Sequence, residues 1–142
     1  MTTTAIPAAP SPGVGRLNPT TWNAAFGYDQ GQLRPAPGRL LTLAGQGPVD
    51  ADGALVHEGD TAAQLALALA NVEAVLTAGG MGLTDVLRLT VYTTDVDGVL
   101  AGYDALTERL AAAGATPPAT LLGVARLAIP GMAVELEVTA GR

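Results

Sequence analysis

Two glutamates near the end of the chain, Glu135 and Glu137, have the side chains and the spacing for acid–base chemistry. They alternate with branched apolar residues in a run that predicts a β-strand over residues 132–140. Residues two apart on a strand point to the same side, about 6.5–7 Å from each other. Because glutamate is disfavoured in strands, two interpretations stay open. The pair forms a solvated or arginine-paired sheet face, or it places a carboxylate at a cleft, where it positions water or carries a proton.

A glycine-containing run, Ala44-Gly45-Gln46-Gly47-Pro48, follows a predicted strand directly. Its glycines either let a ligand approach the backbone, with free N–H groups forming an anion nest, or meet a tight turn that needs a positive φ. The run does not match the glycine-rich dinucleotide-binding pattern, and Pro48 supplies no N–H.

Further polar side chains have both a chemical and a structural interpretation. Tyr28 presents a phenol to a pocket or is a half-buried strand tyrosine, and Tyr92 and Arg88, on one strand face, have the same two interpretations. We expect His57, beside a turn, to be exposed. We expect Arg126 to pair with a carboxylate rather than with a substrate.

The residue types that are missing exclude several classes of chemistry. The chain has no cysteine and no lysine, one histidine and one serine. A cysteine nucleophile, a disulfide, a Schiff base and a P-loop are therefore excluded. We also expect no metal site, since a single histidine cannot supply the usual multi-histidine ligand set. Carboxylate, tyrosine, threonine, arginine and backbone groups remain available for chemistry.

Composition and charge indicate what kind of partner to expect. Only 14% of the residues are charged, against about 25% in typical domains, and 49% are hydrophobic. The apolar surface that this leaves predicts a homo-oligomer. The net charge of −6 and the lack of basic runs argue against nucleic-acid binding. No apolar run approaches the ~18 residues of a membrane span, the start does not match a signal peptide, and the absence of cysteine fits a cytoplasmic protein.

The elements that must position these side chains can be predicted from periodicity and turn residues. We expect a Pro-rich N-terminal arm, flexible or surface-bound, over residues 1–20, and a single domain over residues 21–142. An apolar 3,4 spacing predicts a helix that Asp60 caps and Gly79-Gly80 ends, and Asp97 is expected to cap a second helix that ends at Gly114. The predicted strands cover residues 26–33, 39–44, 54–57, 86–93, 120–127 and 132–140. The passage through residues 86–127 implies a parallel strand pair. The fold class is α+β, a mixed sheet with two helices on one face, whose bare face we expect another subunit to cover.

Six segments in order resemble the RidA family, also known as YjgF/YER057c/UK114 or endoribonuclease L-PSP. The resemblance covers residues 22 to 140 and rests on segments over residues 27–30, 44–50, 71–76, 90–95, 123–127 and 134–138, which read GYDQ, AGQGPVD, NVEAVL, TVYTTD, GVARL and VELEV. It implies a chorismate-mutase-like fold. It also implies a homotrimer whose sheets form a central barrel, with small-molecule clefts between the subunits.

The resemblance also implies an activity and a set of residues. Active members hydrolyse reactive enamines and imines to keto acids and ammonia without a cofactor. Glu137 occupies the place of the glutamate that positions the attacking water, and Tyr28 that of a cleft tyrosine. Ala44, Gly45 and Gln46 occupy the loop that lines the cleft. Tyr92 and Leu121 complete the candidate substrate site.

This chain departs from the family at the arginine that grips the substrate carboxylate. Counting back from the shared Val-Ala-Arg-Leu places Ala119 there, and allowing a one-residue gap places Thr120 there or deletes the position. Arg126 lies ~20 Å from Thr120 along a strand and cannot replace that arginine. We therefore expect an enamine/imine deaminase with altered substrate choice or, alternatively, a non-catalytic trimer that binds or senses a small molecule.

Overall fold

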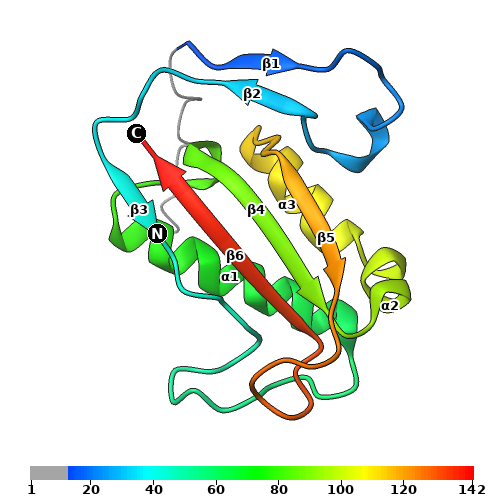
Figure 1. Cartoon of the computed structure of the whole chain (residues 1–142). Coiled ribbons are helices and arrows are strands. Elements are labelled where there is room, and N and C mark those ends of the chain that lie inside the picture. The colour runs from blue at the N-terminus through cyan, green and yellow to red at the C-terminus, as the bar shows by residue number, and fades with distance from the viewer. Residues whose placement is uncertain (1–12) are drawn as a thin grey trace, which may run out of the picture.

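The computed structural model describes residues 13–142, in which a four-stranded mixed sheet packs against helices on one face (Figure 1). The strand order is β3 (Leu40–Thr42), β6 (Val134–Gly141), β4 (Val86–Thr93) and β5 (Ala119–Gly123). β4 runs parallel to β5, whereas β6 is antiparallel to both β4 and β3. The predicted α+β class and the parallel pair are therefore confirmed.

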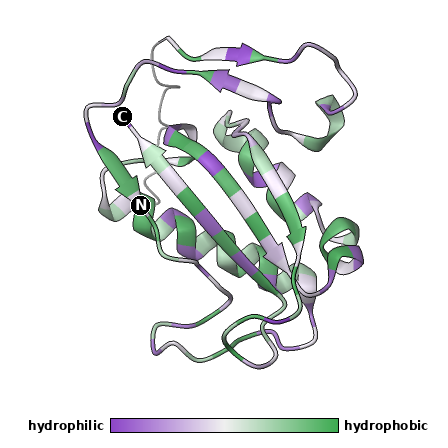
Figure 2. Ribbon diagram, viewed as in Figure 1, coloured by the Kyte–Doolittle hydropathy of each residue, from purple (hydrophilic) through white to green (hydrophobic). Residues whose placement is uncertain are grey.

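The sheet has one apolar and one polar face because its two long strands alternate, apart from a bulge in β4 between Val86 and Arg88 (Figure 2). Leu89 and Val91 on β4, and Leu136 and Val138 on β6, point toward the helices and are buried in the core. The residues between them point to the other face of the sheet, against which none of the helices in residues 13–142 packs. This open face carries both predicted glutamates.

Helix α1 (Thr61–Ala78) supplies the main apolar stripe against the sheet. The Asp60 side chain accepts a hydrogen bond from the Ala63 N–H at 3.0 Å, and Gly79 ends the helix, both as predicted. The stripe that faces the core consists of Leu65, Leu69, Val72 and Leu76. By length and composition α1 also meets the criterion for a membrane span, but a core helix meets it equally well.

The second predicted helix is two short helices, α2 (Val96–Ala101) and α3 (Asp104–Ala113). The expected cap at Asp97 is wrong: Asp95 caps α2, accepting a hydrogen bond from the Gly98 N–H at 3.0 Å. The break falls at Gly102, where the backbone passes so close to Ala62 of α1 that a side chain would collide with it. Gly114 ends α3 as predicted, with a left-handed φ of 70°.

The remaining strand predictions were too long, for identifiable reasons. Residues 24–26 form the 3₁₀ helix η1 (Ala24–Phe26), which ends at Gly27 with φ 76°, so β2 is only Gly31–Leu33. Strand β5 ends at Gly123, because Gly123 pairs with Thr93, the last residue of its partner β4. Residues 54–57 form a single bridge between Leu55 and Val49 rather than a strand. A second 3₁₀ helix, η2 (Leu83–Asp85), precedes β4.

Part of the predicted N-terminal arm takes part in the fold. Residues 1–12 lie outside the described residues. Gly15–Leu17 forms β1, which pairs antiparallel with β2 and lies above the end of the main sheet in Figure 1. The side chain of Arg16 on β1 bonds to Asp29 at 3.0 Å. The arm is therefore attached to the domain from β1 onward.

Candidate functional site

Glu137 and Tyr92 meet on the open face of the sheet. Glu137 lies directly opposite Thr90 across the β4–β6 ladder, which makes Tyr92 its diagonal neighbour. The Tyr92 hydroxyl donates to Glu137 Oε1 at 3.3 Å, longer than the usual O–H···O distance of about 2.7–2.8 Å. Partial burial, together with the Glu137 carboxylate, raises the pKa of Tyr92. Tyr92 therefore keeps its proton and serves as a donor, while the Glu137 carboxylate is exposed and loosely held.

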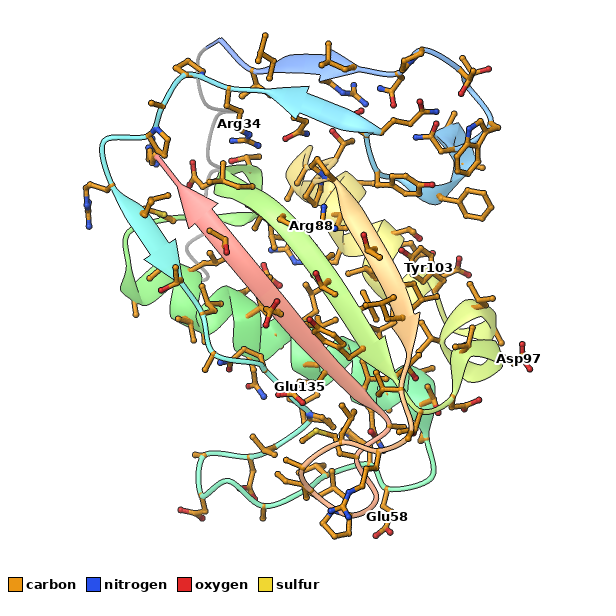
Figure 3. All side chains as sticks on the ribbon, in the orientation of Figure 1. Arg34, Glu58, Arg88, Asp97, Tyr103 and Glu135 are labelled. Atoms are coloured by element: carbon orange, nitrogen blue, oxygen red, sulfur yellow. The ribbon has the colours of Figure 1, made fainter. Side chains whose placement is uncertain are left out.

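The loop over Ala44–Gln46 lies against the same strand, one step away from Glu137. Gln46 and Leu136 exchange two backbone hydrogen bonds of 2.8 and 2.9 Å, which fix the loop to β6. The Gln46 N–H is thereby engaged, so it does not contribute to an anion nest. Gly45 lies so close to the side chain of Glu135 that a Cβ would overlap it. Glu135 lies beside β6 in Figure 3.

The structure gives a different reason for the glycines of this loop. Neither Gly45 nor Gly47 is among the described glycines with positive φ, so the turn interpretation was wrong. Gly47 is instead needed because the thioether of Met132 fills the place of its missing side chain. Close packing of neighbouring side chains, rather than backbone strain, explains both positions.

Tyr28 and Leu121 meet in a second place, a pocket of about 250 Å³ at the β5 edge of the sheet. We call it the aromatic pocket, and its lining residues are Trp22, Phe26, Tyr28, Leu100, Tyr103, Ala119 and Leu121. The Trp22 and Tyr28 rings meet edge to face, with centroids 6.3 Å apart. Figure 3 places Tyr103 beyond β5, at this edge. Ala119, one of the positions at which the sequence predicts the family arginine to be absent, is part of the pocket wall.

A buried carboxylate holds Tyr28 in place. Asp29 is 1% exposed and accepts hydrogen bonds from four side chains, namely Arg16, Asn18, Gln32 and Thr116, at 2.7–3.1 Å. Burial acts to raise the pKa of Asp29, but the four donors outweigh it and hold that pKa well below its usual range. The Asn23 amide donates to the Tyr28 carbonyl at 2.7 Å. Together these contacts fix the backbone that carries the pocket tyrosine.

The two groups of predicted residues lie on opposite faces of the sheet. Leu121 pairs with Val91, which is fully buried on the helix side, whereas Tyr92 and Glu137 project from the open side. The structure therefore brings Glu137 together with Tyr92 and places the 44–46 loop nearby. It also brings Tyr28 together with Leu121, but a single chain does not join the two groups into one cavity.

None of the described arginines lines the aromatic pocket. Arg88 donates to the Thr120 hydroxyl at 2.8 Å on the open face and does not line the aromatic pocket (Figure 3). Arg126 is exposed beyond the end of β5, and none of the ion pairs formed between described residues includes it, so its expected carboxylate partner is not seen.

His57 is exposed as predicted, with a left-handed φ of 62°. Residues 13–142 contain no cluster of three acidic or histidine side chains suited to a metal ion.

Sequence reasoning missed several residues of the aromatic pocket. Trp22 precedes the predicted elements, and Phe26, the first residue of a predicted strand, belongs to a 3₁₀ helix instead. Leu100 lies near the end of α2, and Tyr103 lies just before α3. The only available signal was the concentration of aromatic residues in positions 22–28 of a chain with 4% aromatics. The network around Asp29 carried no signal, because three of its four donors, Arg16, Asn18 and Thr116, lie 13, 11 and 87 positions away.

Comparison with known proteins identifies the family and the fold. The family described as Endoribonuclease L-PSP matches residues 20–141. YyfB of Yersinia pestis, a protein of the conserved Rid family, superposes with a TM-score of 0.78 at 33% identity, over 91% of this chain and 98% of its own. The chain belongs to the RidA family. Another Rid-type fold, Escherichia coli TdcF solved with bound serine, has a TM-score of 0.67 at 29% identity, over 81% of this chain and 87% of its own.

A curated RutC family protein of Pyrococcus horikoshii also matches, with 38% identity over 60 residues. The match covers 42% of this RidA-family chain and 48% of the relative. The chain thus spans about half the length of the curated relatives it matches. These matches establish the family and the fold.

Proposed function

We propose that this RidA-family protein hydrolyses a small reactive enamine or imine without a cofactor, in clefts shared between copies of the chain in a homotrimer. The observation that carries the proposal is the exposed Glu137 carboxylate, which within residues 13–142 is held by a single long hydrogen bond from Tyr92. A carboxylate in this state accepts a proton without first breaking a strong network.

The reaction that fits this arrangement consumes one water. The enamine first moves a proton from nitrogen to carbon and becomes the imine. Glu137 takes a proton from water while the oxygen attacks the imine carbon, and it passes that proton to the nitrogen, which gives a carbinolamine. Glu137 then takes the hydroxyl proton and delivers it to the amine, so that the carbon–nitrogen bond breaks, ammonia leaves, a carbonyl compound remains and the carboxylate is regenerated. Tyr92 keeps the carboxylate oriented throughout.

The placement of the two groups supports a shared cleft. Tyr28 and Leu121 lie on one face of the sheet and Glu137 on the other, so a substrate that touches both needs Glu137 from a second copy. The low charge and the uncovered polar sheet face support such an assembly. The bound serine in TdcF shows that a protein of this fold holds an amino acid.

The altered substrate choice rests on Ala119. The resemblance places the carboxylate-binding arginine here, and this pocket wall carries no charge in its place. Each charge-assisted hydrogen bond that is lost costs about 1.5–3 kcal/mol. A simple 2-imino acid is thus a poor substrate. The family description names an endoribonuclease, but the net charge of −6 argues against phosphate binding.

The test measures ammonia release from a panel of enamines generated in situ. We expect the wild-type chain to accelerate release and Glu137→Gln to reduce the rate by about 10²-fold or more. Glu135→Gln is the matched control, because it removes a carboxylate from the same strand face two residues away. It should retain most of the activity.

The outcomes separate the two candidate functions. If wild type and Glu137→Gln both equal the buffer blank across the panel, the hydrolase proposal is wrong. If a compound then still raises the melting temperature of the wild-type protein, the alternative of a non-catalytic binding trimer takes its place. Equal losses in Glu135→Gln and Glu137→Gln would contradict the assignment of the base to Glu137.

A further inference from the structure

The aromatic pocket has a lining without charged side chains, and this composition determines which ligands it favours. Its residues are two tyrosines, one tryptophan, one phenylalanine, two leucines and one alanine, and none of them is ionised at neutral pH. A buried carboxylate or ammonium without a partner is strongly disfavoured, since the lost hydration has no replacement. The lining therefore offers no charged partner to an ionic group on the part of a ligand that enters.

The pocket also leaves large apolar side chains exposed. Trp22 is 66% exposed, Leu100 52% and Phe26 46%, and all three surround the same cavity. Covering apolar surface of this kind with another apolar group lowers the free energy of the system. Aromatic rings stack on or pack edgewise against such walls, as Trp22 and Tyr28 already do with each other.

Two phenol hydroxyls supply the polar part of the pocket. Within residues 13–142, the structure shows no hydrogen-bond partner for the hydroxyl of either Tyr28 or Tyr103. Burial, followed by the nearby Tyr28, raises the pKa of Tyr103, so this hydroxyl keeps its proton. A neutral phenol is a donor for a carbonyl oxygen and provides no positive charge for a carboxylate.

We propose that the aromatic pocket binds a neutral compound with an aromatic ring next to a carbonyl group, and discriminates against the corresponding carboxylate. The ring packs against Trp22 and Phe26, and the carbonyl oxygen accepts from a tyrosine hydroxyl. The inference rests on the proposed function only in taking this pocket as the site of the non-reacting end of the substrate.

Equilibrium dialysis at about pH 7 tests the discrimination with two probes of nearly equal shape, phenylacetamide and phenylacetate, of which only the second is ionised. We expect phenylacetamide to bind about tenfold more tightly or better. Trp22 is the single tryptophan of the chain, so its fluorescence reports whether the bound probe lies in the pocket.

Equal or tighter binding of phenylacetate would overturn the proposal. Absence of binding by both probes would overturn it as well, and so would binding that leaves the Trp22 fluorescence unchanged.

A charge placed in the pocket sharpens the test. Ala119→Arg should reverse the preference, so that phenylacetate binds more tightly than phenylacetamide. Ala111→Arg is the control, because it adds the same charge on the exposed surface of α3 and should leave the preference unchanged. Tyr103→Phe should weaken phenylacetamide binding severalfold, since it removes a donor and keeps the ring. Thermal unfolding of each variant verifies that it folds.

The results of these measurements can contradict the pocket inference without contradicting the proposed function, and the reverse. The probes bind without turnover, so their affinities can be measured whether or not the protein hydrolyses an enamine. Ammonia release together with a preference for phenylacetate would contradict the pocket inference alone. A preference for phenylacetamide without ammonia release from any enamine would contradict the hydrolase alone.

Discussion

Two carboxylates in different regions of this molecule are used in opposite ways. Asp29, between β2 and the 3₁₀ helix η1, is 1% exposed and receives hydrogen bonds from four side chains. Glu137, on the open face of β6, is exposed and receives one long hydrogen bond. The pKa of Asp29 is held below its usual range by its donors, despite the opposing effect of burial.

The difference shows what separates a carboxylate that shapes a site from one that reacts in it. A buried carboxylate with every lone pair engaged is costly to protonate, and it fixes the segments that donate to it. A carboxylate with free lone pairs changes its protonation state at little structural cost. Asp29 therefore positions the wall that carries Tyr28, whereas Glu137 is available for proton transfer.

The largest expected effect on stability follows from replacing Asp29, the acceptor of the four hydrogen bonds. Asp29→Asn replaces an acceptor oxygen by an amide and removes the charge that faces Arg16, so it should lower the free energy of unfolding by about 3 kcal/mol. Glu73→Gln is the control, because it removes an ion pair with Arg109 near the surface and should cost less than about 1 kcal/mol. Urea unfolding of both variants measures the difference. Equal losses would show that Asp29 is no more important than a surface acid.

The second expected effect is a dependence of stability on pH. The folded-state pKa of Asp29 lies below the unfolded value of about 3.9, so its contribution is complete above that value. The contribution is lost progressively as the pH falls from that value toward the folded-state pKa. Wild-type unfolding free energy should therefore decline in acid more steeply than that of Asp29→Asn. Parallel curves for the two proteins would contradict the role of the buried carboxylate.

The smallest effect on stability is expected at the exposed pair. Glu137→Gln and Tyr92→Phe should leave the midpoint of thermal unfolding of the chain nearly unchanged, since their hydrogen bond is long and lies at the surface. The same two variants should reduce ammonia release, Glu137→Gln far more than Tyr92→Phe. A large fall in the melting midpoint for Glu137→Gln would place this carboxylate with Asp29 as a structural group.

Much of the fold could be predicted from local signals. The limits of β4 over Val86–Thr93 and both ends of α1 follow from alternation, an aspartate cap and a glycine stop. The predictions failed where a contact distant in sequence decides the outcome. Gly102 breaks the second helix because of Ala62 on α1, and β5 stops at Gly123 because its partner strand ends.

The candidate site was predictable only in part, for the same reason. Glu137 on β6 and Tyr92 on β4 lie on the same face of the sheet. In each strand, alternation alone predicts that the residue points away from the apolar face. The aromatic pocket is assembled from η1, the α2–α3 break and β5, which no periodicity connects. The reason for Gly45 was also hidden, because it is the side chain of Glu135, ninety positions later in the chain, that fills the space.

The placement of the pocket and of Glu137 on opposite faces of one sheet has a genetic consequence. If each cleft takes its apolar wall from one copy and its carboxylate from another, two separately inactive chains can complement each other. A chain with Glu137→Gln, mixed with a chain whose pocket is blocked by Leu121→Arg, would then form some clefts in which both contributions are intact. Partial recovery of activity in co-expressed mixtures would be the signature of a site that belongs to the assembly rather than to the polypeptide.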